Sequence, residues 1–119
     1  MEIRSLALAT PFVTTDGSTI RSLLDLSNAP VANQSLAEAT IPPGESTVRH
    51  YHRVSEEIYF LVAGTGEMEI DGERVPVAVG DAILIPPGAW HQITATGDEA
   101  LRLLCACAPP WTAEDTLFA

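Results

Sequence analysis

Short apolar or alternating segments, separated by turn residues, follow one another along most of the chain. The stretches between these segments are rich in Gly, Pro, Asp and Asn, which end strands and form tight turns. The pattern predicts strands at 19–24, 34–41, 46–52, 56–62, 66–70, 73–77, 82–85, 90–95 and 100–107. Many short strands with such spacing are typical of antiparallel sandwiches and barrels, so the predicted fold class is all-β.

Local signals add three further predictions. Asp71-Gly72, between two strand segments, suits the two-residue turn of a β-hairpin. The segment 23–29 predicts a single helical turn. In the tail 111–119, Thr112 followed three residues later by Asp115 resembles a helix-capping pattern and predicts a short helix.

The composition predicts a soluble protein with one domain spanning residues 1–119. Apolar residues make up 46% of the chain, and no apolar run approaches the roughly 18 residues that a membrane-spanning helix needs. The first residues include Glu2 and only a short mixed apolar segment, which is a poor secretory signal. We therefore expect the protein in the cytoplasm.

Charge and cysteine content narrow the class of partner. Sixteen acidic residues against six basic ones give a formal net charge of -10, which disfavours nucleic acids and anionic membranes because phosphate binding requires clustered Lys and Arg. Cys105 and Cys107 are separated by one residue on a predicted strand, a poor geometry for a disulfide. Free thiols fit a reducing compartment, and the expected partner is a small molecule.

Polar residues of a metal-binding type interrupt two of the predicted strands. His50 and His52 are two residues apart, so on a strand they share one face. A turn near residues 54–55 then returns the chain, and Glu57 is expected on the adjacent strand, opposite the histidine pair. Such a pair alone is also typical of an exposed strand. His91, the third histidine of the chain, lies in a similar strand and Pro-Gly turn and strengthens the metal hypothesis.

These residues occur in two spaced motifs that resemble those of the cupin family. The first motif covers 44–64 and is carried by Gly44, His50, His52, Glu57 and Gly64. The second covers 80–95 and is carried by Gly80, Pro86, Gly88 and His91. One position departs from the family pattern, since Ala95 stands where the family has Asn. No ligand position is lost, so this departure concerns a turn more than the metal site.

The resemblance implies a conical β-barrel, or double-stranded jelly roll, of two antiparallel sheets in one cupin domain. It also implies one divalent metal ion held inside by His50, His52, Glu57 and His91, and a homodimer. Three imidazoles and one carboxylate suit Fe, Mn, Ni, Cu or Zn better than Mg or Ca. Four protein ligands leave open positions on a six-coordinate ion for a substrate.

Three more side chains are expected near this site. Tyr59 lies two residues beyond Glu57 and shares its face, so it is either a catalytic acid, base or donor or a packing aromatic. Cys105 and Cys107 share a face opposite Arg102, and they point into the barrel if Arg102 points to solvent. As free cysteines they are expected mainly to pack.

The fold cannot name the reaction, because cupins host many activities. The leading hypothesis is a metal-dependent, dioxygenase-like enzyme acting on a small organic molecule. A metal-dependent lyase or isomerase using Tyr59 is the second hypothesis. A non-catalytic module that binds or senses a small molecule is the third, although no helix-turn-helix effector segment accompanies it.

Overall fold

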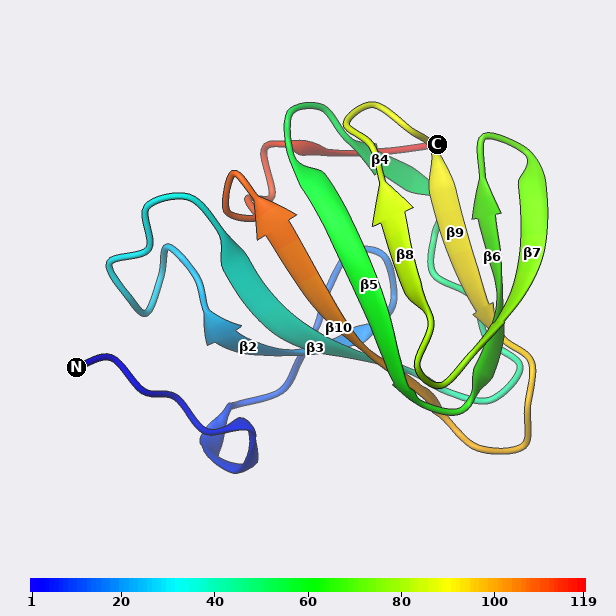
Figure 1. The fold of residues 1–119 in the computed structure, drawn as a ribbon, viewed down its shortest axis with the longest axis horizontal. Coiled ribbons are helices and arrows are strands. Elements are labelled where there is room, and N and C mark those ends of the chain that lie inside the picture. The colour runs from blue at the N-terminus through cyan, green and yellow to red at the C-terminus, as the bar shows by residue number, and fades with distance from the viewer.

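A computed structural model describes all residues, 1–119, and shows an all-β protein (Figure 1). Its two antiparallel sheets have the strand orders β1-β2-β3-β10-β5-β8 and β11-β4-β9-β6-β7. The strands are β1 (Phe12–Val13), β2 (Thr19–Leu24), β3 (Ser35–Ile41), β4 (His50–His52), β5 (Glu56–Ala63), β6 (Thr65–Ile70), β7 (Glu73–Ala78), β8 (Ala82–Ile85), β9 (His91–Ala95), β10 (Leu101–Ala108) and β11 (Thr116–Phe118). A short 3-10 helix, η1 (Leu6–Leu8), precedes them. The chain forms no helix with the length and apolar character needed to cross a bilayer.

The predicted strands are confirmed to within one residue, with a single exception. The segment 46–52 forms a regular strand only at His50–His52, while Ser46 makes an isolated bridge to Thr94. The Asp71-Gly72 hairpin is also confirmed. Both residues have positive φ, 49° and 90°, which is the geometry of a primed two-residue turn between β6 and β7.

The predicted C-terminal helix is wrong. The backbone N–H of Asp115 does donate to Thr112 Oγ1 at 3.3 Å, as the capping pattern indicates. The chain then extends as β11, which pairs antiparallel with β4. Backbone pairing with a distant strand outweighs a weak local helix preference. The pattern also missed β1, whose two residues are too few to show a period.

The core lies between the two sheets and follows from strand alternation. On β5, Tyr59 and Leu61 are buried, whereas the intervening Ile58 and Phe60 are exposed on the outer face. Leu101 and Leu103 of β10 point to the same interior. Period-two burial of this kind is what two sheets packed face to face impose on each strand.

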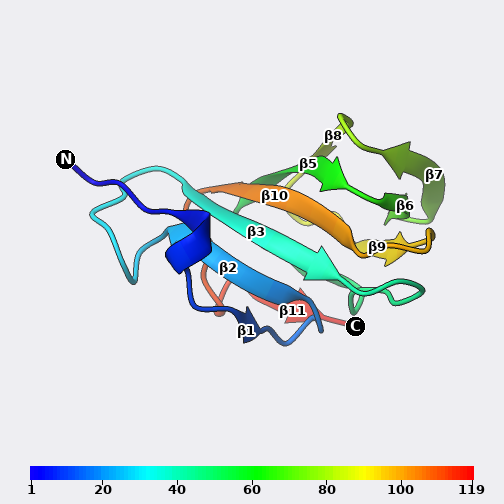
Figure 2. The same cartoon turned by 90° about the horizontal axis from the view of Figure 1, so that it is seen from below.

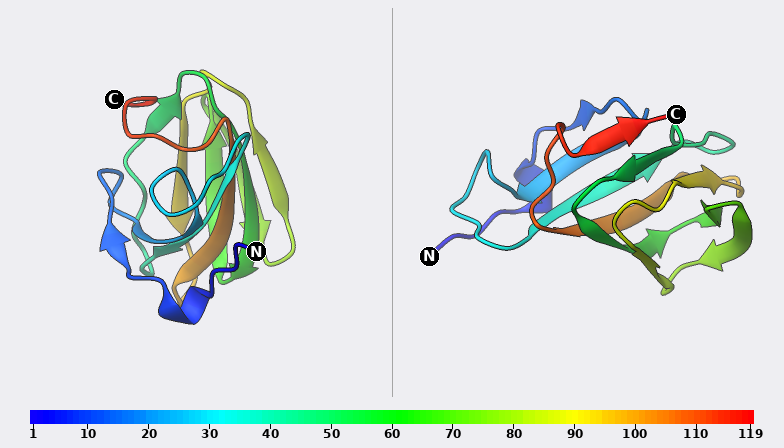
Figure 3. Two further views of the ribbon diagram at one scale, coloured as in Figure 1. Left: turned by 90° about the vertical axis from the view of Figure 1, so that its left-hand side faces the viewer. Right: turned by 90° about the horizontal axis from the view of Figure 1, so that it is seen from above.

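The two sheets are linked on one side and open on the other. Strands β7 and β8, which are edges of different sheets, follow each other directly in the chain through residues 79–81. The other two edges, β1 and β11, lie on the same side of the molecule and do not pair with each other (Figure 2 and Figure 3). Residues of both edges, Phe12 and Val13 of β1 and Thr116 and Phe118 of β11, line the cavity described below.

Candidate metal centre

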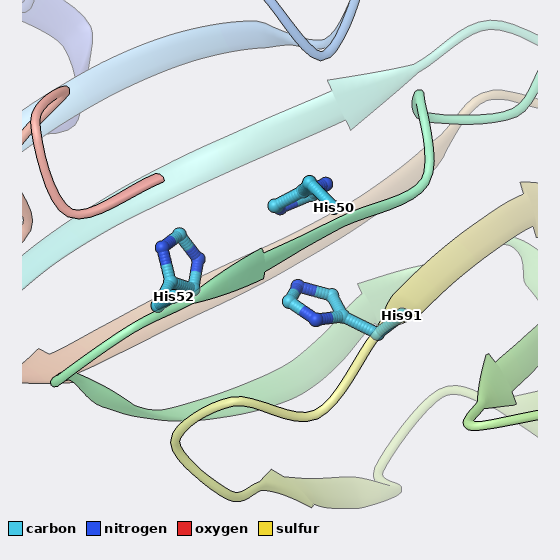
Figure 4. A group of neighbouring side chains, drawn as sticks. All are labelled: His50, His52 and His91. Carbon is cyan, nitrogen blue, oxygen red and sulfur yellow. The ribbon is translucent and has the colours of Figure 1, made fainter. Parts of the chain in front are cut away.

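Three buried histidines meet inside the barrel (Figure 4). His50 and His52 lie on the inner face of β4, and His91 begins β9, where it pairs directly opposite His50. One ligand atom from each ring lies within 4.8 Å of the others. The predicted convergence of these three residues is therefore confirmed as geometry.

In His50 and His91, the contact made by Nδ1 shows which of the two ring nitrogens carries the proton. His50 Nδ1 lies 2.7 Å from the Val48 carbonyl, and His91 Nδ1 lies 3.0 Å from the Ala89 carbonyl. A carbonyl only accepts, so both Nδ1 atoms carry the proton. Each Nε2 then presents a lone pair toward the interior, as metal-binding histidines oriented by a backbone acceptor do.

His52 is also protonated at Nδ1, in this case because a hydroxyl group accepts the proton's hydrogen bond. Its Nδ1 lies 3.1 Å from Thr116 Oγ1. The Thr116 hydroxyl donates its own proton to the Thr112 carbonyl at 3.0 Å, so it accepts from the imidazole. The C-terminal strand β11, which carries Thr116, thus sets the tautomer of a residue on β4.

Glu57 lies beside the histidine cluster, but on the opposite sheet. The prediction that it lies on a strand adjacent to β4 is wrong, since β4 and β5 belong to different sheets and residues 53–55 cross between them. The crossing is held by Asp115, whose carboxylate accepts from the backbone N–H groups of Val54 and Ser55 at 2.8 and 2.9 Å. Glu57 therefore faces the histidines across the barrel interior.

The contacts of Glu57 fit a shared cation. Its Oε1 lies 3.1 Å from His52 Nε2 and 3.5 Å from His91 Nε2. Two unprotonated acceptor atoms approach this closely only when a proton or a metal lies between them. Ligand atoms bound at about 2.1 Å and at right angles to one ion lie about 3.0 Å apart.

Buried polar atoms support the same fit. His91 is fully buried, and its Nε2 has no hydrogen-bond partner. Such orphaned atoms are rare and call for a missing partner such as an ion. The residues present therefore fit a divalent transition metal by donor type and spacing.

The surroundings of His50 and Glu57 favour the uncharged imidazole and the ionised carboxylate, which are the forms that bind a metal. Burial, followed by the charge of His91, lowers the pKa of His50 below its usual value, so the ring is neutral at pH 7. Burial alone would raise the pKa of Glu57, but the adjacent rings of His52 and His91 outweigh it and lower this pKa to about 2. The ring of His50 is therefore uncharged and the carboxylate of Glu57 is ionised at neutral pH.

Tyr59 and the two cysteines line the same interior. The ring of Tyr59 lies 6.1 Å from that of His91. Burial, then the charge of Glu57, raises the pKa of Tyr59 well above 10.0, so the phenol is protonated at neutral pH. Arg102 is exposed, and Cys105 and Cys107 point inward, as the alternation predicts.

Cys107 contacts the centre directly. Its thiol donates to Glu57 Oε2 at 3.2 Å, while Oε1 of the same carboxylate faces the histidines. Burial and the charge of Glu57 raise the pKa of both Cys105 and Cys107, which keeps both thiols protonated. Sequence reasoning expects Cys107 inside the barrel near the site and mainly in a packing role, and no local signal indicates its contact with Glu57.

A cavity of about 280 Å³ adjoins the cluster. Its walls include residues of β1, the turn after β1, β2, β3 and the C-terminal tail, and His50, His52, Glu57 and Tyr59 also line it. The sequence pattern did not identify the wall residues of 12–18, because Thr, Asp, Gly and Ser there indicate only a turn.

The chain belongs to the cupin family. The family profile described as "Cupin domain" matches residues 37–107. The chain is also 45% identical to protein MJ1618 of Methanocaldococcus jannaschii over 106 residues, which are 89% of this chain and 85% of that protein. A solved structure, the cupin 2 conserved barrel domain protein of Salinispora arenicola, shares the fold with a TM-score of 0.76 and 28% identity, covering 96% of this chain and 91% of that one.

One enzyme relative matches over part of its length. Gentisate 1,2 dioxygenase 1 of Aquipseudomonas alcaligenes is 37% identical over 81 residues, which are 66% of this chain but 23% of that enzyme. The similarity therefore covers less than a quarter of the length of that enzyme.

Proposed function

We propose that this cupin is a metal-dependent, dioxygenase-like enzyme that acts on a small organic molecule. One observation carries the proposal: three buried imidazoles have Nδ1 engaged by acceptors and ligand atoms within 4.8 Å of one another, beside a buried carboxylate and a cavity. When bound, a divalent Fe, Mn, Ni, Cu or Zn ion would supply Lewis acidity and, if redox-active, electron transfer between substrate and O2. The partial similarity to gentisate 1,2 dioxygenase 1 supports the oxidative form of the proposal.

The chain's own residues would hold the ion, donate a hydrogen bond to the substrate and exclude water. His50, His52, His91 and Glu57 would hold the ion with a site charge of about +1, since only Glu57 carries charge. Tyr59 would donate a hydrogen bond to a substrate oxygen, because its phenol stays protonated. The apolar walls of the cavity would displace water from the substrate, which strengthens polar contacts inside the site.

Elemental analysis tests the metal first. About one equivalent of transition metal in the purified wild type and much less in His52→Ala is the expected result. Oxygen consumption by the metal-loaded protein with a panel of phenols, diols and enols tests the oxidative step. Metal absent from the wild type, and not taken up on reconstitution, would overturn the proposal in favour of a module that binds its ligand without a metal.

A lyase or isomerase is the alternative that Tyr59 supports. The buried phenol near His91 is suited to donate a proton rather than accept one. Turnover without O2, lost in Tyr59→Phe while the metal content is retained, would favour this alternative. Turnover that requires O2 and survives Tyr59→Phe would exclude it.

We also propose a homodimer through the outer face of the larger sheet. Ile58, Phe60, Val62 and Leu84 are 43%, 42%, 38% and 56% exposed there, and Ile58 pairs directly with Leu84 across β5 and β8. A continuous exposed apolar surface of this kind is typical of a protein contact. Sedimentation should show a dimer that Phe60→Glu dissociates and Val75→Glu, on the other sheet, leaves intact. A monomeric wild type would refute it.

Free thiols agree with a cytoplasmic location.

A further inference from the structure

No Lys or Arg reaches the cavity beside the histidine cluster. Fifteen of its 27 lining residues are hydrophobic, and none of the 27 is a Lys or Arg. The chain's six basic residues are all Arg. Two of them, Arg102 and Arg49, form ion pairs with glutamates that do not line the cavity. Arg102 pairs at 2.6 Å with Glu38, and Arg49 pairs at 2.7 Å with Glu69 and stacks on Trp90.

The charges that do line the cavity are negative. Besides Glu57 they belong to Asp16 and Asp25. Asp16 lies in the turn between β1 and β2, where its carboxylate accepts from Ser18, and its backbone carbonyl accepts from the N–H of Val48 at 2.8 Å. This bond holds the acidic turn against the segment that leads into β4.

Asp25 adds a second fixed negative charge. Burial opposes its ionisation, but hydrogen bonds from Ser22, Ser27 and Asn28 prevail and lower its pKa. Both aspartates are thus held by hydrogen bonds at the wall and do not form ion pairs. An anionic group of a ligand in this part of the cavity would meet repulsion and no neutralising partner.

The remaining polar wall groups are hydroxyls. Thr14 and Ser18 already donate to Asp16, whereas Ser35 and Thr47 accept from backbone N–H groups. Each therefore has only its remaining donor or acceptor capacity for a neutral ligand group. The volume of about 280 Å³ is just below the usual range for small-molecule sites, roughly 300–1,000 Å³. A cavity of about 150 Å³ holds a benzene ring, so the volume suits a ligand of about two fused rings.

We infer that the substrate is an uncharged, largely apolar molecule of about two fused rings that offers neutral oxygens to the ion and carries no further anionic group. This inference rests on the proposed function, because the ion anchors the oxygens. It excludes phosphorylated sugars and dicarboxylates as substrates, since each would bring a charge that the walls cannot pair.

A matched pair of probes tests the inference. The first is a naphthalenediol with adjacent hydroxyls and one neutral ring sulfonamide, and the second is the same diol with a ring sulfonate of nearly the same size in place of the sulfonamide. Both present the same two oxygens, so their difference in affinity reports the added charge. Calorimetric titration of the zinc-loaded protein should show the sulfonate binding at least about tenfold more weakly.

A cavity variant provides the control. Ala37 on β3 lines the cavity opposite Ser22 and Cys105. Ala37→Lys should raise the affinity for the sulfonate by about tenfold relative to Ala37→Met, which adds similar length without charge. The affinity of both variants for the uncharged diol should be similar, which checks that the cavity persists.

The outcomes separate the two proposals. A protein that takes up no metal overturns the proposed function and this inference with it. A protein that holds about one equivalent of metal, measured after the titration, and binds the sulfonate as tightly as the neutral diol overturns this inference alone. The inference alone is also overturned if the loaded protein binds neither probe.

Discussion

The thiol of Cys107 is the one hydrogen-bond donor to Oε2 of Glu57, at 3.2 Å. The other oxygen of this carboxylate faces His52 and His91. Replacing Cys107 by Val retains the volume of a small apolar side chain and removes the donor. Cys107→Ser retains a donor on a slightly shorter bond.

The expected effect follows from the burial of Glu57, which is 4% exposed. A buried acceptor left without its partner costs about 1–3 kcal/mol, and a thiol is a weak donor, so the lower half of this range applies. The cost falls on the metal-bound state, in which the carboxylate must keep pointing at the histidines. Since about 1.4 kcal/mol corresponds to a factor of ten, Cys107→Val should weaken metal binding about tenfold. Removing groups that orient metal ligands has effects of this size, roughly 10- to 100-fold.

Cys105→Val is the matched control, because Cys105 lies on the same strand and face but forms no hydrogen bond with Glu57. Competition titrations of Zn²⁺ against a chromophoric chelator would give the dissociation constants. We expect Cys105→Val to match the wild type and Cys107→Ser to remain within about threefold of it. Equal affinities for the two valine variants would refute the positioning role of the thiol.

Three further predictions concern stability. Gly64→Ala should cost about 1–3 kcal/mol more in urea unfolding than Gly88→Ala, because both have φ near 80° but only at Gly64 would a Cβ meet a backbone oxygen at 2.7 Å; equal midpoints would contradict it. In the metal-free protein the carboxylate of Glu57 stabilises the fold above about pH 4.5, and this contribution of about 3 kcal/mol is lost as pH falls toward its native pKa of about 2. The difference in the free energy of unfolding between wild type and Glu57→Gln should therefore decrease as the pH falls from about 4.5 to about 2. A difference that stays constant over this pH interval would contradict the prediction. Leu61→Ala, at a fully buried position, should cost about 2–5 kcal/mol by thermal unfolding. Val75→Ala, at an exposed position on β7 outside the proposed dimer contact, should cost under about 1 kcal/mol. Similar losses for the two variants would contradict the assignment of Leu61 to the core.

Most of the sheet could be predicted from the sequence because strand alternation is a property of the local backbone. Eight of the nine predicted strands agree with the structure to within one residue. The edge strands β1 and β11 could not be predicted, since two or three residues show no period and gain their stability from pairing with β2 and β4. For the same reason the capping pattern of Thr112 was misleading.

The sequence by itself determined which side chains point inward. Alternation and motif spacing together place His50, His52 and Glu57 inside, and the same parity holds for Tyr59 and Cys107. Inward direction depends only on strand geometry, which repeats every two residues. The ligand types and their chemistry therefore follow from the order of residues along the chain.

Only the tertiary structure decided how these side chains meet. It brought Glu57 to the histidines from the opposite sheet, set the tautomer of His52 through Thr116, and closed the cavity with the acidic turn around Asp16. These relations join segments far apart in sequence, through contacts whose energies depend on the packing of the whole barrel. No local pattern encodes such a relation, because it exists only when the two sheets close on each other.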